Sequence, residues 1–126
     1  MIDQITRKNL LFDFYGKLLS EKKREVMSLY YEEDMSLAEI GSEFGISRAA
    51  VFDSLKKGEK ELEKYEQELG LLEKYLKQRQ AFTEVEALLG EIQEGWKEDK
   101  ALVERLKQIK DVLYQIDKDV IHIDEV

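Results

Sequence analysis

The side chains with the clearest capacity for chemistry lie in the stretch ISRAAVFDSLKK, residues 46–57. In complexes with nucleic acids, serine, arginine and lysine side chains contact phosphates and base edges, and apolar side chains contact thymine methyl groups. The stretch therefore predicts a surface for DNA, or for RNA. The expected contact residues are Ser47, Arg48, Ala49, Phe52, Lys56 and Lys57.

Each of these residues also has a purely structural interpretation. Arg48 and the two lysines would suit an ordinary solvated helix face, and Phe52 would suit packing against the first or second helix of the chain. Asp53 has the wrong charge for a place beside phosphates, and an ion pair with Lys57, four residues later, explains it. Because DNA affinity grows with the number of phosphates neutralised, about three cations predict weak binding by a single copy.

Other kinds of chemistry have little support. The chain has no cysteine and a single histidine, His122, which excludes thiolate zinc sites and histidine clusters. The acidic groups at 32–34 and at Glu84 and Glu86 lie in no recognisable pocket motif, so we expect them to be solvated. We therefore expect no enzymatic activity, no metal, no cofactor and no small-molecule substrate.

The composition favours an all-α fold. Proline is absent, glycine is scarce, and 43% of the 126 residues are hydrophobic, which is enough for a buried core. The N-terminus MIDQITRKNLLFDFYGK mixes charged with apolar residues, and no window approaches the ~18 apolar residues of a membrane span. We expect a cytoplasmic protein that does not enter a membrane.

The net charge of −8 is unevenly distributed. Residues 1–60 carry ten basic and eleven acidic side chains, whereas residues 61–126 carry ten basic and seventeen acidic ones. The first half could approach a phosphate backbone locally. The second half would be repelled by it.

Hydrophobic spacing and capping residues define the elements that must position these side chains. Apolar residues recur at helical spacing over 5–19, and Ser20 is a plausible cap for a second helix. Ser36 and Glu39 form a capping box before a short helix over 37–44. Gly45 permits a left-handed turn, and Ser47 caps a fourth helix at once, which is the helix-turn-helix pattern.

The core of this motif is expected to form between the helix over 37–44 and the helix that Ser47 caps. Ile40 and Phe44 should meet Val51 and Leu55, with Ile46 plugging the turn. Gly41 should lie where a larger side chain would separate the helices. Helical spacing also assigns the aromatic residues to the core rather than to a base-stacking platform, namely Phe12, Phe14, Tyr15, Tyr30 and Tyr31.

The C-terminal half carries a heptad-like apolar seam that needs a partner, either a folded-back neighbour or a second subunit. We expect a homodimer. Gly70, Gly90 and Gly95 should divide this half into two or three helices, and the tail Val120–Val126 should be frayed. The predicted division is a helix-turn-helix domain over 1–66 and charged dimerisation helices over 67–126. The predicted seam comprises Leu69, Leu72, Leu76, Phe82, Val85, Leu89, Ile92 and Trp96.

The order of LLFDFYGKLL, LYYEEDMSLAEI and SRAAVFDSLKKGEK resembles the YlxM family of small helix-turn-helix proteins over roughly residues 5–80. The segment REVMSLYYEEDMSLAEIGSEFGISRAAVFDSLKKGEKEL also resembles region four of bacterial sigma factors, which reads promoter DNA. The first resemblance implies an association with the signal recognition particle pathway. The second implies a DNA-binding fold with a C-terminal helical extension here, and marks Ser47, Arg48, Ala49, Phe52 and Lys56 as contacts.

Two hypotheses follow. In the first, the chain is a dimeric regulatory protein that binds DNA or RNA and acts in the signal recognition particle pathway. In the second, the scaffold serves as a protein-binding adaptor that modulates the particle's GTPase or RNA polymerase without binding DNA. Phe52 on an otherwise outward face motivates the second hypothesis.

Overall fold

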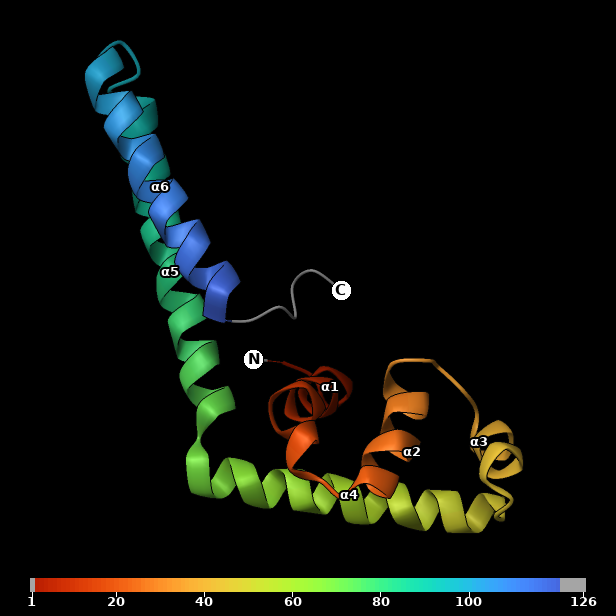
Figure 1. Ribbon diagram of the computed structural model, residues 1–126. Coiled ribbons are helices and arrows are strands. Elements are labelled where there is room, and N and C mark those ends of the chain that lie inside the picture. The colour runs from red at the N-terminus through yellow and green to blue at the C-terminus, as the bar shows by residue number, and fades with distance from the viewer. Residues whose placement is uncertain (1, 121–126) are drawn as a thin grey trace. The chain divides into compact units, whose positions relative to one another are not determined.

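The computed structural model describes residues 2–120, so His122 and the predicted tail beyond Val120 lie outside the described residues. Within the described part, all regular structure is helical, which confirms the predicted all-α fold (Figure 1). The chain divides into two compact units, Met1–Leu72 and Glu73–Val126. The helices are α1 (Gln4–Tyr15), the 3-10 helix η1 (Gly16–Leu18), α2 (Glu21–Tyr31), α3 (Leu37–Phe44), α4 (Arg48–Leu69), α5 (Leu71–Gly95) and α6 (Lys100–Val120).

Unit one is built on α4, against which α1, α2 and α3 all pack. The three helices follow one another along α4, with α3 beside its N-terminal end (Figure 1). Fully buried side chains from all four helices form the core, among them Leu11, Met27, Ile40, Val51 and Leu62. The predicted domain boundary at residue 66 lies inside α4, because that helix continues to Leu69 before the chain turns.

Helix starts in unit one are fixed by side-chain caps, of which those at Ser20 and Ser36 were predicted and that at Asp3 was not. The Ser20 hydroxyl accepts from the Lys23 amide, and the Ser36–Glu39 capping box forms in both directions, with distances of 3.1 and 3.0 Å. Asp3 caps α1 by accepting from the Thr6 amide at 2.7 Å. Each cap satisfies an amide that the helix itself leaves unpaired.

Two details of the first two helices differ from the sequence-based expectation. The first helix ends at Tyr15, and the next three residues tighten into η1. Tyr30 is 40% exposed rather than turned inward, whereas Phe12 and Tyr15 are buried as expected. Phe12 stacks on Tyr31 with ring centroids 5.9 Å apart. Phe14 and Tyr31 are half-buried, so the aromatic residues lie only partly in the core.

Gly58 lies in the core of unit one, where α2 crosses α4. A β-carbon on Gly58 would collide with the sulfur of Met27, whose side chain is completely buried. The glycine thus permits close packing of the two helices.

Gly70 ends α4 in the left-handed conformation, with φ of 63°, and α5 begins at the next residue. A buried polar cluster holds this junction. The Tyr15 hydroxyl donates to the Glu66 carboxylate at 2.6 Å and accepts from the Leu71 amide at 3.0 Å, while the Leu72 amide donates to Glu66 at 3.0 Å. The first amides of α5 are therefore capped by side chains of α1 and α4. Burial raises the pKa of Tyr15, and the hydrogen bond to Glu66 adds to the increase.

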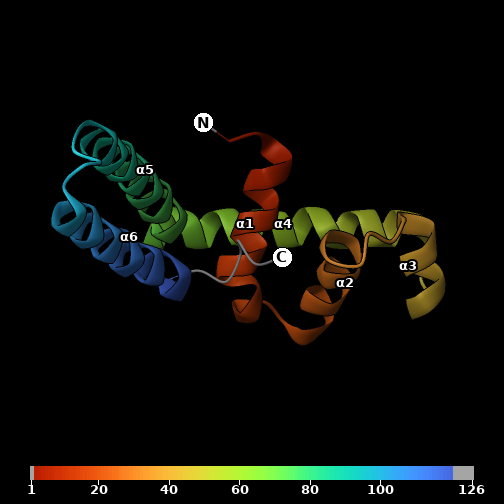
Figure 2. The ribbon, with the colours of Figure 1, turned by 90° about the horizontal axis from the view of Figure 1, so that it is seen from above.

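Unit two is a hairpin of α5 and α6, which run side by side in opposite directions (Figures 1 and 2). Leu89 and Leu106 are buried, and Lys110 donates a hydrogen bond to the Gln93 side chain at 2.9 Å. α5 continues through Gly90 and ends at Gly95, so only the second of these glycines coincides with a helix end. No described helix combines the length and the apolar character needed to cross a membrane.

The residues of the predicted seam have different surroundings. Leu72 and Leu89 are buried within the chain itself, and Leu76 and Phe82 are half-buried. The other four, Leu69, Val85, Ile92 and Trp96, are exposed. Because α6 folds back beside α5, only part of the predicted seam is left for a second copy.

Candidate nucleic-acid interface

The helix-turn-helix forms from α3, a three-residue turn and α4, as predicted. Gly45 takes the left-handed conformation, with φ of 67°, and the Ile46 amide donates to the Gly41 carbonyl at 2.9 Å. Ile40, Val51 and Leu55 are buried, whereas Phe44 and Ile46 are half-buried. The motif is therefore held by the expected core and by an αL cap at the end of α3.

Gly41 sets the distance between α3 and the turn. A β-carbon at this position would lie 2.7 Å from the carbonyl oxygen of Ile46, which is a backbone atom and cannot swing away. The sequence predicted a close approach of the two helices at Gly41. In the structure, Gly41 instead closely approaches the backbone of the turn that precedes α4, at Ile46.

The first turn of α4 is open to solvent. Ser47, Arg48, Ala49 and Ala50 are all exposed, and the first turn contains no acidic residue. The Ser47 oxygen accepts from the Ala50 amide at 3.0 Å, which leaves its hydroxyl proton available to a phosphate or base acceptor. Among the described residues Arg48 has no side-chain hydrogen bond or ion pair, so its full charge faces outward.

Lys57 is paired with Asp53, as the sequence predicted. The Lys57 amine and the Asp53 carboxylate are 3.0 Å apart, and both side chains are well exposed. An exposed pair of this kind contributes little to stability. It does, however, offset the positive charge of Lys57 on the outward side of α4.

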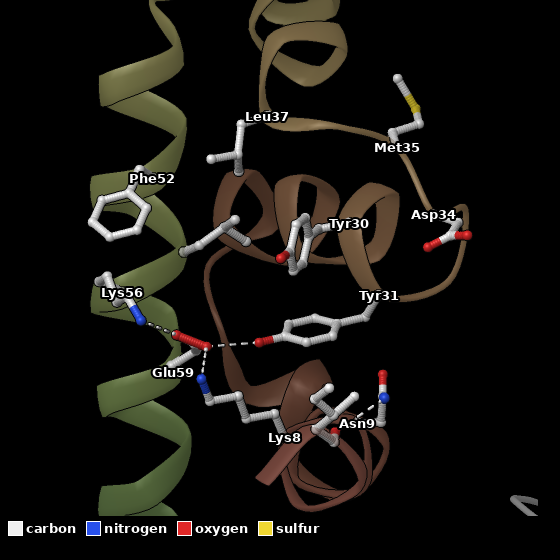
Figure 3. A pocket seen from close by; sticks show the side chains of 12 residues that line it. Lys8, Asn9, Tyr30, Tyr31, Asp34, Met35, Leu37, Phe52, Lys56 and Glu59 are labelled. Atoms are coloured by element: carbon white, nitrogen blue, oxygen red, sulfur yellow. Dashed lines mark hydrogen bonds and ion pairs between the residues drawn. The ribbon is translucent and has the colours of Figure 1, made fainter.

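Phe52 and Lys56 face a cavity of about 390 Å³ that α4 forms with α1, α2 and the α2–α3 connection (Figure 3). The Phe52 ring is 50% exposed at this cavity, and the Lys56 amine lies 5.3 Å from the ring centroid. Tyr30, Leu37 and Ile5 contribute further apolar lining.

Glu59 is the polar centre of this cavity and was not identified from the sequence. Its carboxylate accepts from the Tyr31 hydroxyl at 2.8 Å and lies 3.3 Å from the Lys8 amine and 3.5 Å from the Lys56 amine (Figure 3). Burial raises the pKa of Tyr31, and the hydrogen bond to Glu59 raises it further, so the phenol stays protonated. Lys56 is thereby partly neutralised.

The six predicted contact residues thus fall into two groups. Ser47, Arg48, Ala49 and Lys57 lie on the outward side of α4, whereas Phe52 and Lys56 lie at the cavity. In the described part of the chain, no cluster of three His, Asp or Glu side chains is arranged to hold a metal ion.

Comparisons with known proteins agree with this motif. The model of a family described as "Putative helix-turn-helix protein, YlxM / p13 like" matches residues 2–109. A UPF0122 protein of Listeria monocytogenes is 44% identical over 109 residues, which cover 86% of this chain and 99% of that protein. A UPF0122 protein of Listeria welshimeri has the same identity and coverage, and one of Bacillus mycoides is 43% identical over 109 residues.

Proposed function

Because the chain belongs to the UPF0122 family of YlxM / p13-like helix-turn-helix proteins, we propose that it binds nucleic acid, principally duplex DNA, as a regulatory protein. The proposed surface runs from Ser47 to Lys57, with Ser47, Arg48 and Ala49 in the first turn of α4 and Lys57 beside the phosphate backbone. RNA is the second possible nucleic-acid partner of the same surface.

The observation that carries this proposal is the exposure of one turn. The buried residues Val51 and Leu55 hold α4 onto the core, while all four residues from Ser47 to Ala50 remain exposed and the first turn of α4 contains no acidic residue. The N-terminal end of a helix carries partial positive charge and unpaired amides, which suits a phosphate group. The first turn of α4 therefore combines backbone and side-chain donors.

The number of free cations limits the affinity. Arg48 is unpaired among the described residues, Lys57 faces Asp53, and Lys56 faces Glu59. Each phosphate neutralised contributes about 0.9 to the slope of log affinity against log salt. We therefore expect a shallow slope, of about one to three per copy, and weak binding by a single copy.

The test is binding to genomic duplex fragments at about 50 mM salt, where electrostatic contacts are strong. Arg48→Gln should weaken binding about 5- to 150-fold and reduce the salt slope by about one. Arg24→Gln is the matched control, because Arg24 is an exposed arginine on α2 beside Gly16 and Lys17. No binding to any duplex, or equal effects of the two substitutions, would refute the proposal.

The resemblance to the YlxM family supports a place in the signal recognition particle pathway. We propose the particle's components as partners, in addition to DNA. GTP hydrolysis by the particle's GTPase should change when this protein is added at saturating concentration. An unchanged rate would remove this part of the proposal.

A second candidate function is that of a protein-binding adaptor that modulates the particle's GTPase or RNA polymerase. The cavity at Phe52 favours it, because half-exposed aromatic and apolar side chains around a hollow suit the insertion of an apolar side chain from another protein. Two substitutions distinguish the two candidate functions. Phe52→Ala should abolish co-purification with the protein partner and leave DNA binding nearly intact, while Arg48→Gln should do the reverse.

A further inference from the structure

The α5–α6 hairpin exposes an unusual number of large apolar side chains. From Glu73 onward, eight of them are between 37% and 61% exposed among the described residues, and all but Tyr114 form the group considered next, whereas Leu89 and Leu106 are buried. Scattered apolar residues are normal on a surface, but a contiguous group indicates a binding site. The group comprises Val85, Leu88, Ile92 and, just after α5, Trp96, together with Ile109, Val112 and Ile116 of α6.

These residues share one side of the hairpin. Successive helical residues are turned by about 100°, so Val85, Leu88 and Ile92 fall within a sector about 60° wide on α5, and Ile109, Val112 and Ile116 do so on α6. On α5 the centre of this sector lies about 70° around the helix axis from the buried Leu89, and on α6 it lies about 90° from the buried Leu106. The direction of rotation, viewed from the N-terminus of each helix, is the same. Because the helices are antiparallel, the two sectors point to the same side. We name this surface the hairpin face.

The hairpin face is large enough for a dimer interface. A large side chain such as an aromatic one buries on the order of 150 Å² or more when it is covered. With the observed exposed fractions, the seven side chains offer on the order of 500 Å² per copy. Two such faces together reach about 1,000 Å², which is the size that a specific interface needs.

The composition of the hairpin face suits self-association. An interface around a twofold axis must be complementary to itself, and an apolar strip meets this condition without any matching of charges. Arg105 adjoins the strip and lines, with Gln108, Ile109 and Val112, a hollow of about 410 Å³ that can receive a side chain from the opposite copy.

Part of this face lies beyond the region shared with the family. The family model ends at residue 109, and α6 continues to Val120. Val112 and Ile116 belong to this additional stretch, so they extend an apolar strip that would otherwise end at Ile109. The additional half of α6 thus enlarges the strip.

We propose that a second copy of this chain covers the hairpin face, so that the protein is a homodimer joined through α5 and α6. This inference is independent of nucleic-acid binding. Its failure would leave the DNA proposal standing, because the two are measured by different experiments.

Light scattering on the full chain tests the proposal. The wild-type protein should have twice the monomer mass of 14.8 kDa. Val112→Glu places a charge within the apolar strip and should yield a monomer. Tyr114→Glu is the matched control, because Tyr114 is 61% exposed but lies about 200° away around α6, and this variant should remain a dimer. A wild-type monomer, or a dimeric Val112→Glu variant of unchanged helicity, would overturn the proposal.

A second measurement guards against misfolding of the charged variant. The chain contains no cysteine, so a single introduced thiol reports on one position only. Val112→Cys should be cross-linked into a dimer by a short bismaleimide, and Tyr114→Cys should not. Equal cross-linking of the two variants, or none at Val112→Cys, would refute the hairpin face as the interface.

Discussion

Asp53 controls how much positive charge the outward side of α4 can present. Its carboxylate lies 3.0 Å from the Lys57 amine, and the pair is exposed, so it contributes little to folding. Near a phosphate backbone the same carboxylate would be repelled. On the proposed nucleic-acid surface, Asp53 should therefore lower affinity more than it supports the fold.

Asp53→Asn should strengthen duplex binding, because it removes a negative charge and frees Lys57 for a phosphate. We expect the slope of log affinity against log salt to become steeper by about one. Titration of one duplex at several salt concentrations measures both quantities. Glu104→Gln in α6 changes the net charge equally at an exposed position and should leave the slope unchanged. Equal slopes for Asp53→Asn and the wild type would show that Lys57 does not approach a phosphate.

Local contacts of this kind could be predicted from the sequence, and distant ones could not. Residues four apart on a helix always face each other, which is why the Asp53–Lys57 pair was predictable. The Tyr31–Glu59 hydrogen bond joins residues 28 positions apart on two helices. It depends on how α2 packs against α4, so no local pattern in the sequence indicated the polar centre of the cavity.

Among the elements, the crossing of α2 and α4 tolerates no side chain at Gly58. Gly58→Ala should lower the free energy of unfolding by about 1–3 kcal/mol, because the added methyl group overpacks the buried Met27. Gly90→Ala is the opposite case, since a β-carbon there meets nothing within 4 Å in the middle of α5. It should stabilise its helix by about 0.5–1 kcal/mol. Chemical denaturation followed by circular dichroism measures both changes, and an equally stable Gly58→Ala variant would contradict the close crossing.

The contact between α1 and α4 should make stability depend on pH. Arg7 makes two hydrogen bonds to Glu63, at 2.9 and 2.8 Å, and they hold the pKa of Glu63 below its ordinary value of 4.5. A carboxyl group whose pKa is lower in the folded state stabilises the fold above the unfolded-state pKa and loses this contribution as the pH falls.

We therefore expect Glu63→Gln to lose less stability than the wild type as the pH decreases from about 5 to 3. Denaturation curves at several pH values measure the difference. Glu68→Gln removes an exposed carboxylate from the same helix without touching Arg7, and it serves as the control. Parallel curves for Glu63→Gln and the wild type would show that the Arg7 contact does not stabilise the fold.

Helix ends were predictable where a single residue decides them. Ser36, Glu39, Gly45 and Ser47 act through contacts within four residues, and the structure confirms all of them. The return of α6 beside α5 depends instead on which apolar surfaces meet. The heptad-like spacing showed that α5 needs a partner, but a folded-back helix and a second copy present similar side chains to it.

At the scale of the whole molecule, salt should act in opposite directions on the two proposed associations. Residues 61–126 carry ten basic and seventeen acidic side chains, so two copies joined through α5 and α6 repel each other electrostatically. Salt screens this repulsion and strengthens the dimer, whereas it weakens contacts with phosphates. Raising the salt concentration from about 50 to 200 mM should therefore tighten the dimer while duplex binding falls.

Sedimentation at increasing salt concentration measures the dimer, and a parallel titration measures duplex binding. If the association constants of the dimer and of duplex binding both decrease with salt, the dimer depends on ion pairs rather than on the apolar hairpin face.

The cluster of Tyr15 and Glu66 at the end of α4 has a consequence for the order of folding. The first amide of α5, that of Leu71, is held by a hydroxyl 56 residues earlier in the sequence, so a long loop must close before this amide is capped. Helices formed from local contacts alone do not have this delay. The amide of Leu71 should thus acquire protection from hydrogen exchange only when α1 has docked on α4, whereas the amide of Leu72, which donates to Glu66 six residues earlier, can be protected without α1. The Leu71 amide therefore reports when the N-terminal unit is complete.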